Sequence, residues 1–166
     1  MTAIPDYRWG NIKILNKGAL AFASTKPGSW AIRKLMPLDR KVMLKTGGKR
    51  SVLGPVGVHS LLLETTGRKS GQPRVSPLLY ARDGESVIVA GSNFGQARHP
   101  AWSGNLIAQP DAKVTAGGVE VPVRAELLEG EEAAAAYQKM IVSASVYAVY
   151  KTRTDRDIRV FRLTPR

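Results

Sequence analysis

The chain of 166 residues has no cysteine and only two histidines, His59 and His99. The lack of cysteine excludes a disulfide framework, a thiolate metal site and a cysteine nucleophile. Two histidines are too few for a multi-histidine metal centre, so we expect no metal. The sequence also has no run of about 18 apolar residues, which argues against a membrane-spanning helix. Its start has no basic stretch leading into a continuous apolar segment, so we predict no signal peptide and a cytoplasmic protein.

Acidic residues are scarce as well, since 25 Lys and Arg stand against 13 Asp and Glu, a net charge of +12. Residues 1–50 hold 11 of the cations but only two acids, Asp6 and Asp39, and therefore carry +9. Residues 51–166 carry the remaining +3. The hydrophobic share of 43% fits a folded chain and argues against disorder. We predict a basic helical region over residues 1–50 and a separate, near-neutral domain over residues 51–166.

The basic region has an interrupted helical pattern. Residues 9–23 predict one short helix, and a second is expected from about Trp30, with Pro37 as an interruption or a first-turn residue. Two interpretations of this second helix stay open. It packs over the core with a solvated basic face, or it contacts an anionic membrane surface at the inner face of the cell membrane. The residues behind the membrane interpretation are the apolar row Leu35, Leu38 and Val42, the lysines Lys34, Lys41 and Lys45, and the anchors Trp9, Phe22 and Trp30.

Beyond residue 57 the pattern changes to short strands joined by tight turns. The turn signals are Asp83-Gly84 and Gly117-Gly118. Six strands with few helices between them predict an antiparallel barrel and not a parallel sheet. We expect the strands at residues 58–66, 74–82, 86–91, 112–116, 119–128 and 158–163, and helices at residues 100–109 and 130–143, the latter continuing to Lys151.

Three segments are candidates for chemistry. GRKSGQPR places Arg68, Lys69, Ser70 and Arg74 in one glycine-bounded loop, a cradle for phosphate or carboxylate groups. A solvated basic turn explains this loop equally well.

The segment GSNFGQARHPAWSGNL follows a buried strand and leads into a helix whose N-terminus offers free N–H groups. In the third segment, Tyr147 and Tyr150 share a helical face, either lining a pocket or capping the core. No Ser–His–acid triad or carboxylate pair is recognisable. An enzyme with so few acid–base candidates would delegate its chemistry to a bound cofactor.

The run LLLETTGRKSGQPRVSPLLYARDGESVIVAGS, with HPAWSGNLIAQPDAKV and the late TDR, resembles the deazaflavin-dependent nitroreductase family. The resemblance covers about residues 58–163. It implies a split β-barrel of the kind that also binds flavin mononucleotide, with packing helices, and coenzyme F420 as cofactor. Two of three tyrosine positions of the nitroreductase that names the family match Tyr147 and Tyr150, while the third is Ala144. The implied cofactor contacts are Arg68, Lys69, Ser70, Arg74, Val75, Ser76, Pro77, Leu78, Leu79, Ala90, Gly91, Ser92, Asn93, Ala101, Trp102 and Asn105.

The activity that the resemblance implies is hydride transfer from reduced F420 to a quinone, an enone or another activated double bond, with nitro compounds as a further candidate class. Tyr147 and Tyr150 are the implied catalytic residues, and the proton comes from the solvent or from one of these tyrosines. Alternatives are a split barrel that binds flavin mononucleotide or haem, a basic nucleic-acid-binding protein, and a non-catalytic protein at the membrane surface. The basic residues are not interleaved with a platform of stacking aromatics, so we expect a small-molecule substrate and no nucleic acid.

Overall fold

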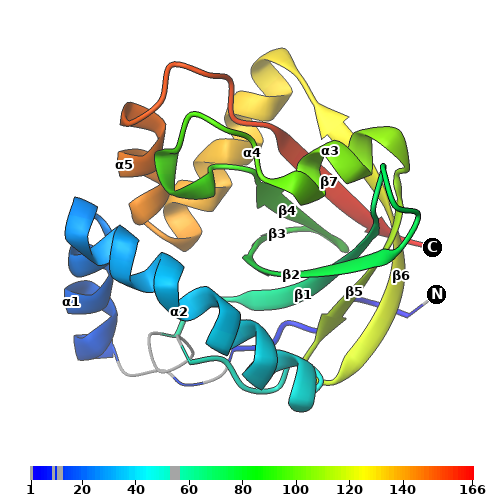
Figure 1. Ribbon diagram of the computed structural model, residues 1–166, viewed down its shortest axis with the longest axis horizontal. Helices are drawn as coiled ribbons and strands as arrows, with labels where there is room; N and C mark the ends of the chain where they lie inside the picture. The colour runs from blue at the N-terminus through cyan, green and yellow to red at the C-terminus, as the bar shows by residue number, and fades with distance from the viewer. Residues whose placement is uncertain (1, 9, 11–12, 53–56) are drawn as a thin grey trace.

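Seven antiparallel strands form one strongly curled sheet in the computed structural model of the chain, which describes residues 2–8, 10, 13–52 and 57–166 (Figure 1). The order across the sheet is β2-β1-β5-β6-β7-β4-β3. The strands are β1 Ser60–Thr66, β2 Pro73–Leu79, β3 Ala81–Asp83, β4 Ser86–Ala90, β5 Asp111–Ala116, β6 Val119–Leu128 and β7 Val160–Pro165.

The curl of the sheet follows from the link between its two edges. β2 and β3 lie at opposite ends of the strand order, yet the chain passes from Leu79 to Ala81 through the single residue Tyr80. The two edges must therefore meet at one end of the sheet, and the barrel stays open along the seam between them. Tyr80 is fully buried, and its hydroxyl donates to the carbonyl of Pro5, which fastens the N-terminal segment across this link.

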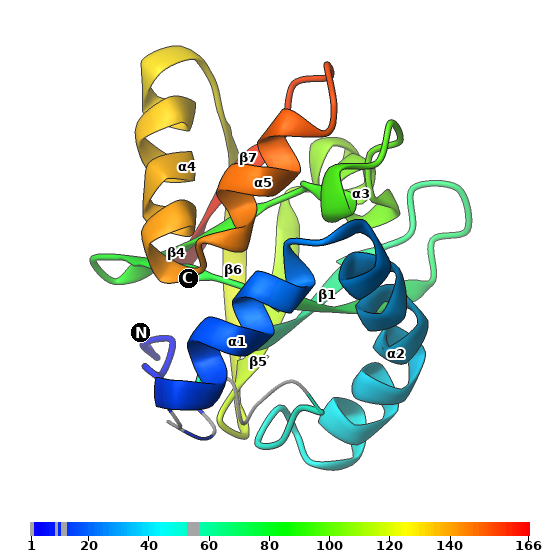
Figure 2. The same cartoon turned by 90° about the vertical axis from the view of Figure 1, so that its left-hand side faces the viewer.

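Helices cover the outside and the open side of the sheet. α1 (Lys13–Ala23) and α2 (Lys26–Lys45) lie over the open side, as Figures 1 and 2 show. The other helices are α3 (Ala101–Ala108), α4 (Gly130–Ser143), α5 (Val146–Thr152) and the short 3-10 turn η2 (Asn93–Gly95). No helix of the described part of the chain has the length and apolar character needed to cross a membrane.

Alternating side chains of the strands build two hydrophobic cores. Val87 and Val89 of β4 point into the barrel, whereas Ile88 and Ala90 pack against α4 and α5. Period-two alternation in a strand has this result when both faces are covered. The second core places the tyrosines of α4 and α5 beside the open seam.

The expected elements needed three corrections. The strand predicted over residues 74–82 is two strands, because the chain changes edges at Tyr80. The helix predicted over residues 130–151 is two helices, because Ala144 has an extended backbone (φ −149°, ψ 107°). The second N-terminal helix begins at Lys26 and not near Trp30, since Thr25 caps it by accepting a hydrogen bond from Gly28 N at 3.0 Å.

The α2 helix also turns a different face inward than its apolar pattern suggests. It runs through Pro37, which is exposed, and buries Asp39 and Met43 against the sheet. Leu35 and Leu38, from the predicted apolar face, are 42% and 52% exposed. The predicted first helix starts at Lys13 in the described residues, and Trp9 lies outside them.

Candidate functional site

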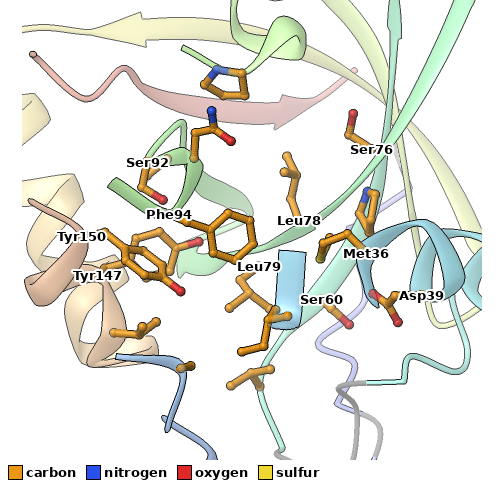
Figure 3. A pocket seen from close by; sticks show the side chains of 18 of the residues that line it. Met36, Asp39, Ser60, Ser76, Leu78, Leu79, Ser92, Phe94, Tyr147 and Tyr150 are labelled. Atoms are coloured by element: carbon orange, nitrogen blue, oxygen red, sulfur yellow. The ribbon is translucent and has the colours of Figure 1, made fainter. Parts of the chain in front are cut away.

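A cavity of about 350 Å³ lies between α1–α2 and the open side of the curled sheet. Its walls come from α1, α2, β1, β2, the end of β4, η2, α3 and α5, and most of its lining is apolar (Figure 3). Arg153, which follows α5, holds the α1–α2 wall of the cavity in place. Its guanidinium donates to Ser29 Oγ at 2.8 Å and to the carbonyl of Ser24, so α5 is fastened to the α1–α2 turn.

Tyr147 and Tyr150 form one end of the cavity, and both are 6% exposed. Their rings meet edge to face with centroids 5.9 Å apart, and Phe94 packs on Tyr150 at 5.6 Å. Tyr137 supports the pair from α4 by donating to the carbonyl of Tyr147 at 2.8 Å. Burial raises the pKa of both cavity tyrosines above the ordinary value, so their hydroxyls remain protonated near neutral pH and act as hydrogen-bond donors.

The turn after β4 borders the cavity beside these tyrosines and has an unusual backbone. Asn93 and Phe94 have φ values of 47° and 58°, in the left-handed region that residues other than glycine seldom adopt. Arg156 secures this turn, donating from Nη2 to the carbonyls of Gly91 at 3.0 Å and Ser92 at 2.9 Å, and from Nε to that of Gln96 at 2.9 Å. The late TDR motif thus contributes a side chain that shapes the rim.

A second cleft of about 540 Å³ adjoins the cavity, and Pro100 lines both. We name it the basic cleft, because Arg68, Arg98 and Arg159 line it together with His99. Partial burial, together with the neighbouring arginines Arg159 and Arg156, lowers the pKa of His99 below its usual value. The imidazole is therefore neutral at pH 7, and the cations of this cleft are its arginines.

Gly104 makes room for one of these arginines. A Cβ atom at this position would lie 1.6 Å from Nη1 of Arg68, so the guanidinium occupies the space that a side chain on α3 would fill. Asn105 orients the loop that carries Arg68. Its Oδ1 accepts from Arg68 N at 3.1 Å, and its Nδ2 donates to Thr65 Oγ1 at 3.0 Å.

The structure brings many of the expected site residues to these two hollows, but not all. Arg68 and Ala101 line the basic cleft. Lys69 and Ser70 are exposed on the β1–β2 loop, and Arg74 is exposed at the start of β2. Asn105 is buried behind that loop, and Val75 and Gly91 flank the cavity lining. The expected residues that line the cavity are Ser76, Pro77, Leu78, Leu79, Ala90, Ser92, Asn93, Trp102, Tyr147 and Tyr150.

Sequence reasoning missed the contribution of α2 to the cavity. Ile32, Met36, Asp39 and Met43 line it and recur at intervals of four, three and four residues, which is the helical period. The signal was present, but the row Leu35, Leu38, Val42 was favoured because it is uniformly apolar. The carboxylate of Asp39 interrupts the apolar pattern of the row that lines the cavity, so this row was not recognised as an inward face.

An open, curled antiparallel barrel is the fold of the split-barrel proteins, and an apolar cavity beside a cluster of arginines suits a flat, anionic cofactor. The comparisons with known proteins narrow this class. The family model of the F420H(2)-dependent quinone reductases matches residues 35–165, and the chain belongs to that family. The expected split β-barrel and the resemblance to F420-using reductases are thereby confirmed, and the family's reductases use reduced F420.

Curated relatives and solved structures agree with this assignment. The chain is 36% identical over 136 residues to the F420H(2)-dependent quinone reductase Rv1261c of Mycobacterium tuberculosis, covering 80% of this chain and 91% of the relative. The solved F420-H2 dependent reductase FDR-A is 35% identical, with a TM-score of 0.58 over 63% of this chain and 92% of its own. A structure described as a domain-swapped dimer is 30% identical, with a TM-score of 0.60 over 83% and 99%.

Proposed function

We propose that this chain reduces quinones with reduced F420, holding the deazaflavin ring and the electron acceptor together in the cavity between α2, β2 and α5. The observation that carries the proposal is the pairing of an apolar cavity with an adjoining basic cleft, in a chain that belongs to the quinone reductase family. An apolar cavity suits a flat ring system and a quinone, and arginines suit phosphate and carboxylate groups.

The residues fit an F420 molecule in two parts. Ser76 to Leu79 of β2, with Ala90 and Ser92, would border the ring in the cavity. Arg68, kept in place by Gly104 and Asn105, would bind the phosphate or the glutamate tail, with Lys69 on the same loop and Arg74 at the start of β2. Reduced F420, when bound, supplies a hydride equivalent to the acceptor.

The protein's own part in catalysis is positioning. The α1–α2 wall, fastened by Arg153, would border the acceptor and orient it against β2. The hydroxyls of Tyr147 and Tyr150 donate hydrogen bonds to the carbonyl oxygen of the acceptor, which stabilises the negative charge that develops on that oxygen. Burial keeps these hydroxyls protonated, so they are donors throughout the neutral pH range.

A binding titration followed by turnover tests the proposal. Oxidised F420 should bind at micromolar concentrations, seen as a change in its fluorescence, and flavin mononucleotide should bind more weakly. Reduced F420 should be reoxidised when menadione is added. Lys69→Ala or Arg74→Ala should weaken binding much more than Tyr150→Phe does, while Tyr150→Phe should lower turnover. Equal effects on binding would contradict the assigned roles.

We further propose that the outer face of α1–α2 contacts an anionic membrane, where lipid-soluble quinones reside. Phe22, Trp30 and Leu38 are 53%, 55% and 52% exposed, and Lys34 lies 5.8 Å from the ring of Trp30. Exposed apolar side chains among lysines are typical of helices that lie on anionic membranes. This face belongs to the region of residues 1–50 that carries +9. The division of the chain near residue 50 stays a prediction.

Sedimentation with vesicles tests the membrane contact. Wild-type protein should bind vesicles rich in phosphatidylglycerol and not vesicles of phosphatidylcholine, and the double substitution Trp30→Ser with Leu38→Ser should abolish binding. The matched control is Val142→Ser on α4, where the side chain is 81% exposed on a different face. Equal loss in this control, or binding that ignores lipid charge, would contradict the proposal.

A further inference from the structure

The cavity has polar groups at two separate ends. Tyr147 and Tyr150 lie at one end, while Asp39 lies at the other beside Ser60, with apolar side chains such as Leu78 between them (Figure 3). The tyrosine end offers hydrogen-bond donors. The α2 end offers a carboxylate, which only accepts.

Asp39 is the one carboxylate among the described residues that line the cavity, and no Lys, Arg or His stands among them. Its side chain is 3% exposed. The Oδ1 atom accepts from Ser51 Oγ at 2.8 Å and from Val52 N at 2.6 Å, which ties α2 to the segment that follows it. The Oδ2 atom receives no hydrogen bond from any residue that the structure describes.

No fully buried side-chain N or O atom of the described residues lacks a hydrogen-bond partner, so Oδ2 is open to the cavity, where a bound molecule can donate to it. A carboxylate oxygen in a largely apolar cavity gains from such a donor. A plain quinone carbonyl placed against Oδ2 would be repelled, because both oxygen atoms are hydrogen-bond acceptors. A carboxylate on the acceptor would be repelled more strongly. A neutral O–H group at this position would instead form a charge-assisted hydrogen bond.

We propose that Asp39 selects the electron acceptor by accepting a hydrogen bond at Oδ2 from a neutral hydroxyl group. The preferred acceptor is then a quinone or enone with a carbonyl at the tyrosine end and a hydroxyl-bearing substituent at the α2 end. This inference rests on the proposed quinone reduction and specifies the class of substrate.

Two matched substrates test it: 2-hydroxymethyl-1,4-naphthoquinone, which carries the donor, and its methyl ether, which does not. For the wild-type protein, kcat/KM with reduced F420 should favour the alcohol over the ether by about tenfold or more, the range of a hydrogen bond to a charged group. Binding of each quinone, followed by quenching of tryptophan fluorescence, should show the same preference without turnover.

The variant Asp39→Asn gives a sharp prediction. Its amide oxygen can keep both bonds to Ser51 and Val52, so the NH2 group replaces Oδ2 at the cavity and an acceptor becomes a donor. The preference for the alcohol should disappear, and the ether should bind as well or better. Ser51→Ala is the control for a purely structural role, because it removes a bond to Oδ1 and leaves Oδ2 in place. It should lower stability and retain the preference for the alcohol.

Three results would overturn the inference: no preference in the wild type, an unchanged preference in Asp39→Asn, or loss of the preference in Ser51→Ala to the same degree. If the protein reduces both quinones without preference, the proposed role of Asp39 is wrong and the proposed quinone reduction is supported. If the alcohol binds preferentially but reduced F420 is not reoxidised, the role of Asp39 in recognition is supported and the proposed quinone reduction is wrong.

Discussion

Replacing Gly104 by alanine should stabilise the protein and weaken cofactor binding at the same time. Gly104 lies in the interior of α3, where alanine is favoured over glycine by roughly 0.5–1 kcal/mol. The new Cβ would lie 1.6 Å from Nη1 and 2.9 Å from Cζ of Arg68. The colliding atoms are the far end of a flexible side chain, so the guanidinium moves away and the helix is retained.

The loss in binding follows from the contact that Arg68 would make. A hydrogen-bonded contact between a guanidinium and a phosphate or carboxylate contributes about 1.5–3 kcal/mol, so F420 affinity should fall by at least about tenfold. Fluorescence titration measures the affinity, and thermal unfolding measures the stability. In an Arg68→Ala background, Gly104→Ala should change affinity no further.

Gly18→Ala is the matched control for the same substitution. Gly18 also lies inside a helix, α1, and an added Cβ there would meet no atom within 4 Å. It should show the gain in stability and bind F420 like the wild type. Wild-type affinity in Gly104→Ala would refute the role of Arg68, and so would an equal loss of affinity in Gly18→Ala.

Two further predictions concern charge and pH. Asp83 accepts hydrogen bonds from Lys139 and Arg162, which hold its pKa below the usual value. Asp83→Asn should therefore lower the free energy of unfolding by about 1–2 kcal/mol, whereas Asp111→Asn, at a more exposed ion pair, should lower it by about 0.5 kcal/mol or less. Chemical denaturation measures both losses, and equal losses would contradict this. Burial and Arg8 lower the pKa of His59 below 6.5, so the unfolded chain binds the proton more readily and stability should fall as pH drops from 7 through 6.5. The fall should be smaller in His59→Gln, and an unchanged slope of stability against pH in that variant would contradict the assignment.

The sequence predicted the barrel well because its strands carry local signals. Short apolar runs and glycine turns such as Gly117-Gly118 set the strands and their antiparallel pairing. The change of edge at Tyr80 could not be predicted, since it depends on how far the sheet curls and not on any residue nearby. A continuous β-favouring pattern across residues 74–82 looks the same whether one strand or two are formed.

The site was partly predictable for the same physical reason. Loop composition and the tyrosine spacing pointed to Arg68 and to Tyr147 with Tyr150, because these signals lie within a few residues of each other. Asp39 was not predicted, although it shares a helical row with Met36 and Met43, because a single carboxylate on a basic helix predicts a solvated side chain. Its burial results from the tertiary placement of α2 over the open side of the sheet.

The most direct test of quinone reduction combines two parallel titrations with one addition of a quinone. Oxidised F420 and flavin mononucleotide are titrated side by side into the purified protein, and menadione is then added to the protein with reduced F420. We predict micromolar binding of F420, weaker binding of flavin mononucleotide, and rapid reoxidation of reduced F420. Absence of F420 binding at micromolar concentrations, or bound F420 that menadione does not reoxidise, would contradict the account.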